Sequence, residues 1–512
     1  MALFSVPAKA ENLAEALEKA YAENPSLSAQ RARTRAADEL KTQANAAYGP
    51  SIDATGNYIY TRQSSNGLFG GINEGGATDY TVTLNQPFFT FGRLAAGQNI
   101  ARAQRLAERE SLRLAEQTLI AETVLVYVGV QRDLALYGAR LQIAALLDEQ
   151  FEITKRRFEL RASTVTDVEQ VDNQRQIARA LAEEALATLE ASANEYRRIV
   201  GKYPGELEPL PTTPILPQLE ELLRIADQTS PQIGVAAFSE NAARQLVALR
   251  RAERMPTVSG IAGARRIPAT PFDDSRRALQ GFAGISITMP VYRGGALGSR
   301  IREASELAQA ARFDREEVRR GVRSDASSNW AQAQAARRVA PIYQEAVQSG
   351  QEALLNARRQ ETAGLRTSRE IIDITNDLLN ARINAINAAA NGYTASVLTL
   401  FEAGLLDPAM FSARVEPYDP DGYDPFFAGF AGLPLRPVLA PIDRIFVEDR
   451  LDDIVIYYEN AYGWEVPQPP VVDTADEALT GENKDTEYPD IFPTPRFVPN
   501  AESQASGSDS LD

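Results

Sequence analysis

One segment of the chain occurs twice, and this repetition restricts the fold more than any other feature of the sequence. The stretch QPFFTFGRLAAG, residues 86–97, returns in altered form as MPVYRGGALGSR, residues 289–300. From the repeated stretch onward, matching residues of the two copies are 203 positions apart. Matching residues that precede the stretch are 206 positions apart. Matching over so many positions indicates a tandem duplication of about 200 residues. The chain must therefore build one structural unit twice, over residues 11–210 and 211–410.

Each copy begins with an alanine-rich helical stretch, at about residues 25–48 and 231–254, followed by two segments typical of strands. The predicted strand pairs are 51–62 with 78–88 and 257–266 with 279–290. In the first pair, apolar residues alternate with mostly polar ones: Ile52, Ala54, Tyr58 and Tyr60, then Tyr80, Val82 and Leu84. Alternation with a period of two predicts strands with one apolar face.

A very long helix follows each strand pair. The first copy has no proline between Pro87 and Pro204, and an apolar heptad track runs from Val130 through Leu141 to Phe158. A helix over residues 93–158 would span about 100 Å at 1.5 Å per residue, which a compact globule cannot contain. The chain then turns near RASTVTDV and returns to about Val200, and the second copy does the same at GLRTSREIID. Each copy is predicted as a strand pair on a long helical hairpin.

The strands require partners beyond the chain itself. An isolated two-stranded hairpin is marginal in water and exposes its edges. Strands of about ten residues with one apolar face match those of outer-membrane barrels. Four strands cannot close a pore alone, so we expect the chain to oligomerise. The sequence contains no run of 18 apolar residues, so no transmembrane helix is predicted.

Composition excludes most enzyme chemistry. The chain has no cysteine and no histidine, which removes thiol nucleophiles, histidine acid–base pairs, disulfides and ordinary zinc sites. We therefore predict no enzymatic activity, no cofactor and no metal. Residues 411–512 hold 21 acidic against 6 basic side chains, whereas residues 1–410 hold 48 against 47. The balanced body offers no basic face for nucleic acid.

Both ends of the chain differ from the repeats. Ala8 and Ala10 form the pattern that precedes a signal-peptidase cleavage site, so we expect residues 1–10 to be the remnant of a signal peptide whose true start lies upstream. Residues 411–512 contain 13 of the 29 prolines and most of the net charge, which predicts a largely disordered tail. One part of the tail, from Ile442 to Trp464, is apolar enough to dock on some surface, and the sequence leaves open whether the tail binds a partner or only covers the tunnel wall.

The stretches LNQPFFTFGR, ITMPVYRGGALGSRIREA, RASTVTDVEQ and GLRTSREIIDITNDLLNA together resemble the TolC family of trimeric outer-membrane channels. The resemblance covers about residues 12–406. It implies an α+β membrane protein in which three protomers form a 12-stranded β-barrel in the outer membrane, continuous with a 12-helix tunnel across the periplasm. The acidic tail would then lie in the periplasm. Such a protein conducts a substrate and catalyses no reaction.

The type I secretion branch of the family is the most similar, on the basis of VYRGG, SRIREA and GLRT. That branch implies a periplasmic adaptor (a membrane fusion protein), an inner-membrane ABC transporter and a secreted protein as partners. Two alternatives remain open. One is the outer-membrane component of a multidrug efflux pump, working with an RND pump. The other is a soluble periplasmic coiled-coil structural protein, which would have no use for alternating strands.

The resemblance also implies roles for individual residues near the two helical turns. Glu370 and Asp373 match acidic residues that face the pore, where threefold symmetry would make each a ring of three carboxylates. Residues that match the latch holding this entrance shut are Arg366, Thr166 and Asp167. The sequence departs from the family pattern at Arg161, where glycine is frequent, and at Glu361, where an aromatic residue is common. These departures predict an entrance network that differs from that of other members.

The repeated stretch itself is interpreted as the junction between barrel and tunnel. Pro87 and Pro290 cannot donate to a strand ladder, so we expect them to end the strands. Gly92, Gly294 and Gly295 would allow the backbone angles needed to enter the helices. Two junctions per protomer would explain why the stretch occurs twice.

Overall fold

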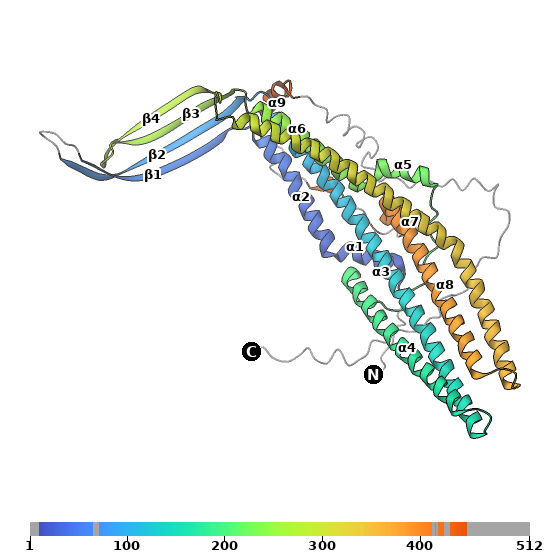
Figure 1. Cartoon of the computed structure of the whole chain (residues 1–512). Helices are drawn as coiled ribbons and strands as arrows, with labels where there is room; N and C mark the ends of the chain where they lie inside the picture. The colour runs from blue at the N-terminus through green and yellow to red at the C-terminus, as the bar shows by residue number, and fades with distance from the viewer. Residues whose placement is uncertain (1–9, 65–70, 412–414, 416–417, 424–430, 448–512) are drawn as a thin grey trace, which may run out of the picture.

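The computed structural model describes residues 10–64, 71–411, 415, 418–423 and 431–447. Figure 1 shows an elongated molecule, with a narrow sheet at one end and long helices running away from it. Almost all of the predicted signal-peptide remnant, residues 1–10, lies outside the described residues. Most of the tail, residues 411–512, lies outside them as well.

The sheet contains four antiparallel strands in the order β1-β2-β3-β4. Their bounds are β1 (Ser51–Ser64), β2 (Ile72–Phe89), β3 (Thr257–Thr270) and β4 (Asp273–Thr288). β2 begins six residues before its predicted start, in a glycine-rich stretch without alternation. A Cβ atom on Gly76 would lie 2.1 Å from the hydroxyl of Tyr58, so the glycine makes room for a tyrosine on the neighbouring strand. β3 and β4 also extend further into the connecting loop than predicted.

The register brings the apolar residues of all four strands to one face. Ile52 lies opposite Leu84, Val82 lies opposite Ala264, and Ile285 lies opposite Gly260. Directly opposed residues of antiparallel strands point to the same side of a sheet. The other face carries polar pairs such as Asp53 with Thr83.

Substitutions on opposite faces of β2 test this assignment. Val82→Arg places a charge on the apolar face and is expected to cost about 2–4 kcal/mol near the midplane of a bilayer. Thr83→Arg, whose neighbour across the strand pair is Asp53, is expected to be tolerated. The readout is the yield of assembled protein in purified outer membranes. Equal yields for the two variants would show that the faces are wrongly assigned.

Two long helical hairpins form the rest of the molecule. α3 (Arg93–Glu159) and α7 (Ala296–Thr362) each contain 67 residues and start 203 residues apart. α4 (Val165–Val200) and α8 (Ser368–Glu402) return beside them. The sequence prediction of one helix over residues 93–158 agrees with α3 to within one residue. None of the described helices combines the length and the apolar composition that crossing a membrane requires.

Short helices surround the hairpins. They are α1 (Leu13–Glu23), α2 (Pro25–Ala46), α5 (Leu219–Thr229), α6 (Pro231–Ala252) and α9 (Arg436–Arg444), with single 3₁₀ turns at Pro408–Met410 and Pro420–Gly422. α2 and α6 lie in the half of the molecule next to the sheet. There α2 packs on α3, and α6 lies between α3 and α7.

The largest apolar core lies near the middle of the long helices, where α1 packs on α3 and α4. Tyr127 is fully buried there, and its hydroxyl shares its one proton between the carbonyl oxygens of Glu11 and Glu208, at 2.9 and 2.7 Å. These bonds fasten the segment before α1 and the segment after α4 to the same helix. The heptad track predicted for α3 is buried in the protomer at Val130 but exposed at Leu141 and Phe158.

One described part of the tail forms a helix. α9 packs against α3 and β2, at the base of the sheet (Figure 1). The end of α9 overlaps the segment from Ile442 that the sequence marks as apolar enough to dock. The remainder of that segment, from residue 448, lies outside the described residues.

Candidate pore entrance and barrel junctions

The two hairpins turn by the same local mechanism at the end of the molecule farthest from the sheet. The hydroxyl of Thr164 accepts a hydrogen bond from the backbone N–H of Asp167 at 3.2 Å, and the Asp167 carboxylate accepts one from the N–H of Thr164 at 2.9 Å. Thr367 and Glu370 form the equivalent reciprocal pair at 3.5 and 3.2 Å. Such capping boxes satisfy N–H groups that a helix start leaves without partners. The turn sequences therefore define where α4 and α8 begin.

The predicted latch residues do not meet within one protomer. The Asp167 carboxylate is engaged by the backbone and side chain of Thr164 and by Ser163, and these hydrogen bonds hold its pKa below its ordinary value. Arg366 donates from Nε to the Gln360 side-chain oxygen at 2.6 Å, within its own hairpin. Thr166 is exposed in the first turn of α4. Among the described contacts, none joins Arg366 to Thr166 or Asp167.

The predicted pore acids lie on one face of α8. Glu370 and Asp373 are both exposed, and Asp377, which the sequence prediction did not include, is exposed on the same face. Their spacing of three and then four residues places them on one stripe of a helix. The stripe continues as exposed amide side chains at Asn380, Asn384 and Asn391. The heptad spacing of these residues was visible in the sequence and could have identified Asp377.

A buried polar cluster near the turns connects the two hairpins. Glu361 at the end of α7 is only 3% exposed, and its carboxylate accepts hydrogen bonds from Gln150 at 2.7 Å, Arg157 at 3.2 Å and Ser368 at 3.2 Å. Arg157 also donates to the Glu361 carbonyl oxygen at 2.7 Å. Thr154 lies within hydrogen-bond distance of Ser368. We name Gln150, Thr154, Arg157, Glu361 and Ser368 the hairpin clasp.

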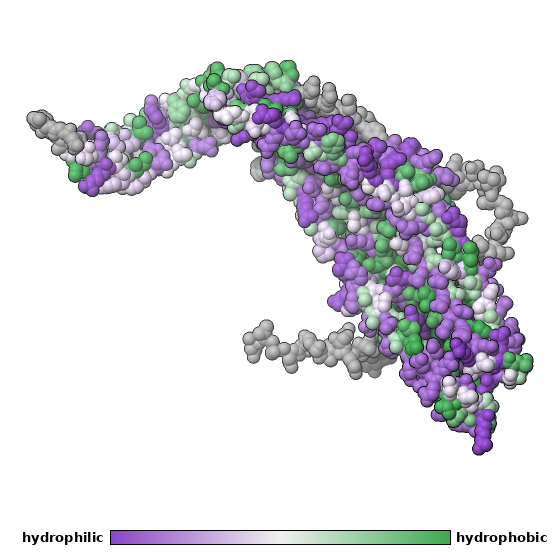
Figure 2. Space-filling view, viewed as in Figure 1, coloured by the Kyte–Doolittle hydropathy of each residue, from purple (hydrophilic) through white to green (hydrophobic). Residues whose placement is uncertain are grey.

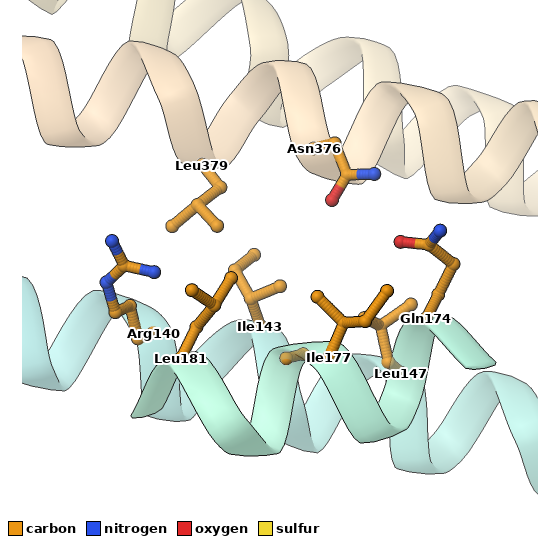
Figure 3. A pocket seen from close by; sticks show the side chains of 9 residues that line it. Arg140, Ile143, Leu147, Gln174, Ile177, Leu181, Asn376 and Leu379 are labelled. Atoms are coloured by element: carbon orange, nitrogen blue, oxygen red, sulfur yellow. The ribbon is translucent and has the colours of Figure 1, made fainter. Parts of the chain in front are cut away.

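The remaining contact between the hairpins near the turns is mainly aliphatic. Figure 3 shows side chains of α3 and α4, among them Ile143 and Ile177, facing Leu379 and Asn376 of α8 across a small crevice. Ile143 and Ile372 also belong to a buried cluster shared by α3, α4 and α8. Aliphatic contacts have little directional preference, so they allow two helix pairs to slide. The polar groups of the hairpin clasp therefore fix the register of the hairpins.

The strands pass into the long helices at two junctions that share one backbone feature. Gly92 and Gly295 occupy the N-cap positions of α3 and α7 with φ values of 85° and 82°. Only glycine adopts this left-handed conformation without strain. Gly294 also has a positive φ, of 58°. Pro290 follows the last residue of β4 by two positions.

The prediction that Pro87 ends its strand is wrong. β2 continues to Phe89, and its register with β3 shifts between Pro87 and Phe89. An extra residue in one strand disrupts the ladder locally, and proline is tolerated at such a bulge because the hydrogen-bond pattern is already broken there. The two copies therefore leave the sheet differently, although both enter a helix through a glycine.

A sequence model of the family described as outer membrane efflux protein matches residues 16–201 and 222–403, which cover most of both repeats. The chain belongs to this family. The match confirms the resemblance to TolC-type channels that the sequence indicated.

Members of the outer membrane efflux protein family match over most of the chain. The outer membrane efflux protein BepC of Brucella suis is 28% identical over 421 residues, which are 81% of this chain and 90% of BepC. The alkaline protease secretion protein AprF of Pseudomonas aeruginosa is 25% identical, over 64% of this chain and 70% of AprF. The solved structure of the CmeC outer membrane channel of Campylobacter jejuni has a TM-score of 0.68, with 14% identity over 78% of this chain and 88% of CmeC.

Channels of this efflux protein family are trimeric and non-enzymatic. The fold is an α+β membrane channel in which four strands per protomer make a 12-stranded barrel, continuous with a helical tunnel. Homologues are outer membrane proteins and work with adaptor proteins and inner-membrane transporters. In this assembly the unpaired edges of β1 and β4 have partners, because each protomer supplies one third of a closed sheet.

Proposed function

We propose that the protein is the outer-membrane duct of a type I secretion system, which carries a protein from an inner-membrane ABC transporter through a periplasmic adaptor to the outside. The observation that carries this proposal is the pair of 67-residue helices joined directly to the sheet, because at 1.5 Å per residue each is long enough to extend about 100 Å from the membrane. The stretches VYRGG, SRIREA and GLRT, together with the similarity to AprF, favour the secretion branch.

A second function, drug efflux with an RND pump, is favoured by the similarity to BepC, which covers more of the chain than AprF does. Deletion of the gene separates the two functions. If the duct serves secretion, the deletion strain loses one or more proteins from the culture medium and keeps its resistance to dyes and detergents. Drug hypersensitivity with an unchanged set of extracellular proteins would instead assign the duct to efflux.

We also propose that the helical turns form the periplasmic entrance, with Glu370 and Asp373 facing the pore. Three protomers turn each residue into a ring of three carboxylates, and Asp377 adds a third ring farther along α8. Rings of one charge gather cations and exclude anions. Two carboxylates ~7 Å apart repel each other by about 0.6 kcal/mol in water and by ~2 kcal/mol at an effective dielectric constant of 20. The closed entrance therefore needs links between protomers that offset this repulsion.

Arg366 supplies such a link in this proposal, by reaching Thr166 or Asp167 of a neighbouring protomer. Its exposure and its single bond to Gln360 leave other guanidinium donors available for that contact. Arg366→Ser is expected to raise the conductance of channels in planar bilayers several-fold, because an exposed charge pair contributes up to about 1 kcal/mol. An unchanged conductance would overturn the latch and leave the channel function standing.

A further inference from the structure

The C-terminal helix α9 (Arg436–Arg444) attaches to the first junction through a polar side chain. Asp443 is only 3% exposed, and its carboxylate accepts hydrogen bonds from the Gly92 N–H at 2.8 Å, the Thr90 hydroxyl at 2.9 Å and the Ala95 N–H at 3.1 Å. α3 starts at a glycine that has no side chain to cap it. Asp443 thus serves as the cap of α3, where a negative charge also interacts favourably with the helix dipole.

Aromatic contacts extend this attachment. The ring of Phe446 lies 5.3 Å from that of Phe89 and 5.4 Å from that of Phe91, between ring centroids. Phe91 has a φ of 50°, whereas the second copy has Gly294 at the matching position. A phenylalanine in this left-handed region is strained. The aromatic contacts with Phe89 and Phe446 offset that strain, which shows that the first junction is adapted to the C-terminal segment.

The opposite face of α9 is apolar and exposed. Val438, Ile442 and Ile445 are 61%, 44% and 77% exposed, and they lie on one stripe because they are spaced four and three residues apart. Pro437 and Pro441 are exposed as well. A helix that docks on a water-soluble surface normally turns its apolar stripe towards the protein. α9 does the reverse, so its outer stripe fits an apolar environment.

The position of α9 identifies this environment. Phe89, which contacts Phe446, lies opposite Val258, and Val258 lies opposite Ile287 on the apolar face of the sheet. α9 is therefore at the base of the sheet, on the side of the face assigned to lipid. Figure 2 shows hydrophobic residues over this bend of the molecule, where Figure 1 places α9. The exposed Arg444 is next to the stripe and can reach anionic headgroups.

We propose that α9 is an interfacial membrane anchor. It lies at the periplasmic boundary of the outer membrane, pinned to the junction by Asp443, with Val438, Ile442 and Ile445 in the lipid. Helices with a strong apolar face insert about 5–10 Å into the boundary between headgroups and acyl chains. The proposal rests on the proposed placement of the sheet in the outer membrane. The anchor is compatible with a periplasmic tail, since it places α9 at the membrane end of the tunnel on the periplasmic side.

Site-specific fluorescence tests the anchor, and the natural absence of cysteine makes single labels straightforward. Ile445→Cys, Val82→Cys and Ile342→Cys are each labelled with an environment-sensitive nitrobenzoxadiazole probe and reconstituted as full-length protein in phosphatidylethanolamine/phosphatidylglycerol vesicles. Val82 reports on the barrel, and Ile342, which is exposed on α7, reports on the tunnel. The quenchers are two spin-labelled lipids used together, one labelled near its headgroup and one deep in its acyl chain, so that a probe at the membrane surface and a probe near the midplane are both within reach.

The anchor predicts that the probe at residue 445 is quenched at least twofold, that the probe at residue 82 is also quenched, and that the probe at residue 342 is not. Quenching at residue 82 without quenching at residue 445 overturns the anchor and leaves the barrel in place. The anchor is also overturned if the emission of the probe at residue 445 shifts to the blue without being quenched. That result would indicate that a neighbouring protomer or the rest of the tail covers residue 445. Absence of quenching at both positions overturns the membrane placement itself.

Discussion

Glu361→Ala is expected to open the channel, with a larger effect than any other single substitution at the entrance. The change removes the acceptor for Gln150, Arg157 and Ser368 and leaves the Arg157 guanidinium without its carboxylate partner. Breaking a buried ion pair by removing one partner costs about 3 kcal/mol or more. We assign the hairpin register that the clasp holds to the closed entrance. Because 1.4 kcal/mol corresponds to tenfold in an equilibrium constant, this arrangement should be disfavoured about 100-fold in the variant. Purified channels in planar bilayers should then show mainly a high-conductance state.

Glu149→Ala is the matched control for this experiment. Glu149 also bridges α3 to α7, through Arg358 at 3.1 Å, but its side chain is 56% exposed, whereas that of Glu361 is 4% exposed. Exposed pairs of this kind contribute less than about 1 kcal/mol, so this variant should conduct like the native channel. If Glu149→Ala and Glu361→Ala conduct alike, burial of the hairpin clasp is not what holds the hairpins in register.

The Glu370→Ala/Asp373→Ala double variant is expected to lose most of its block by multivalent cations. Each substitution removes three charges from the trimer at once, and a trivalent cation bound by two carboxylate rings should lose at least tenfold in affinity. The measurement is the concentration of hexaamminecobalt that halves the current when it is added from the side of the tunnel. Selectivity for potassium over chloride should fall in the same recordings.

A second double variant, Glu183→Ala/Glu190→Ala, removes the same number of charges from exposed positions on α4, well away from the turn. This variant should keep the block of the native channel. An unchanged block in Glu370→Ala/Asp373→Ala would refute the ring assignment. A reduced block in both double variants would show that the effect comes from overall charge.

Features that depend on local sequence could be predicted. Strand faces follow from the alternation around Val82, the starts of α3 and α7 follow from the glycines before them, and the helical turns follow from the stretches RASTVTDV and GLRTSREIID. The repeat supported each of these predictions, because the same pattern occurred twice. The glycine-rich start of β2 has no alternation, so its pairing depends on the neighbouring strand and was missed.

Contacts between distant parts of the chain could not be predicted from one sequence. Glu361 was recognised only as a departure from the family pattern, since its partners Gln150 and Arg157 are more than 200 residues away. The bond between Asp443 and Gly92 crosses 351 residues and lies outside the repeats. An aspartate within an acidic tail is usually solvated, and only the fold shows that this one is buried at a helix start.

The most direct test of the central claim is the mass and location of the native assembly. Cells are fractionated into soluble periplasm, inner membrane and outer membrane, and the protein is extracted with mild detergent for native mass spectrometry. A trimeric outer-membrane channel predicts a species of three chains, recovered from the outer-membrane fraction. A monomer recovered from the soluble periplasmic fraction without detergent would contradict the account.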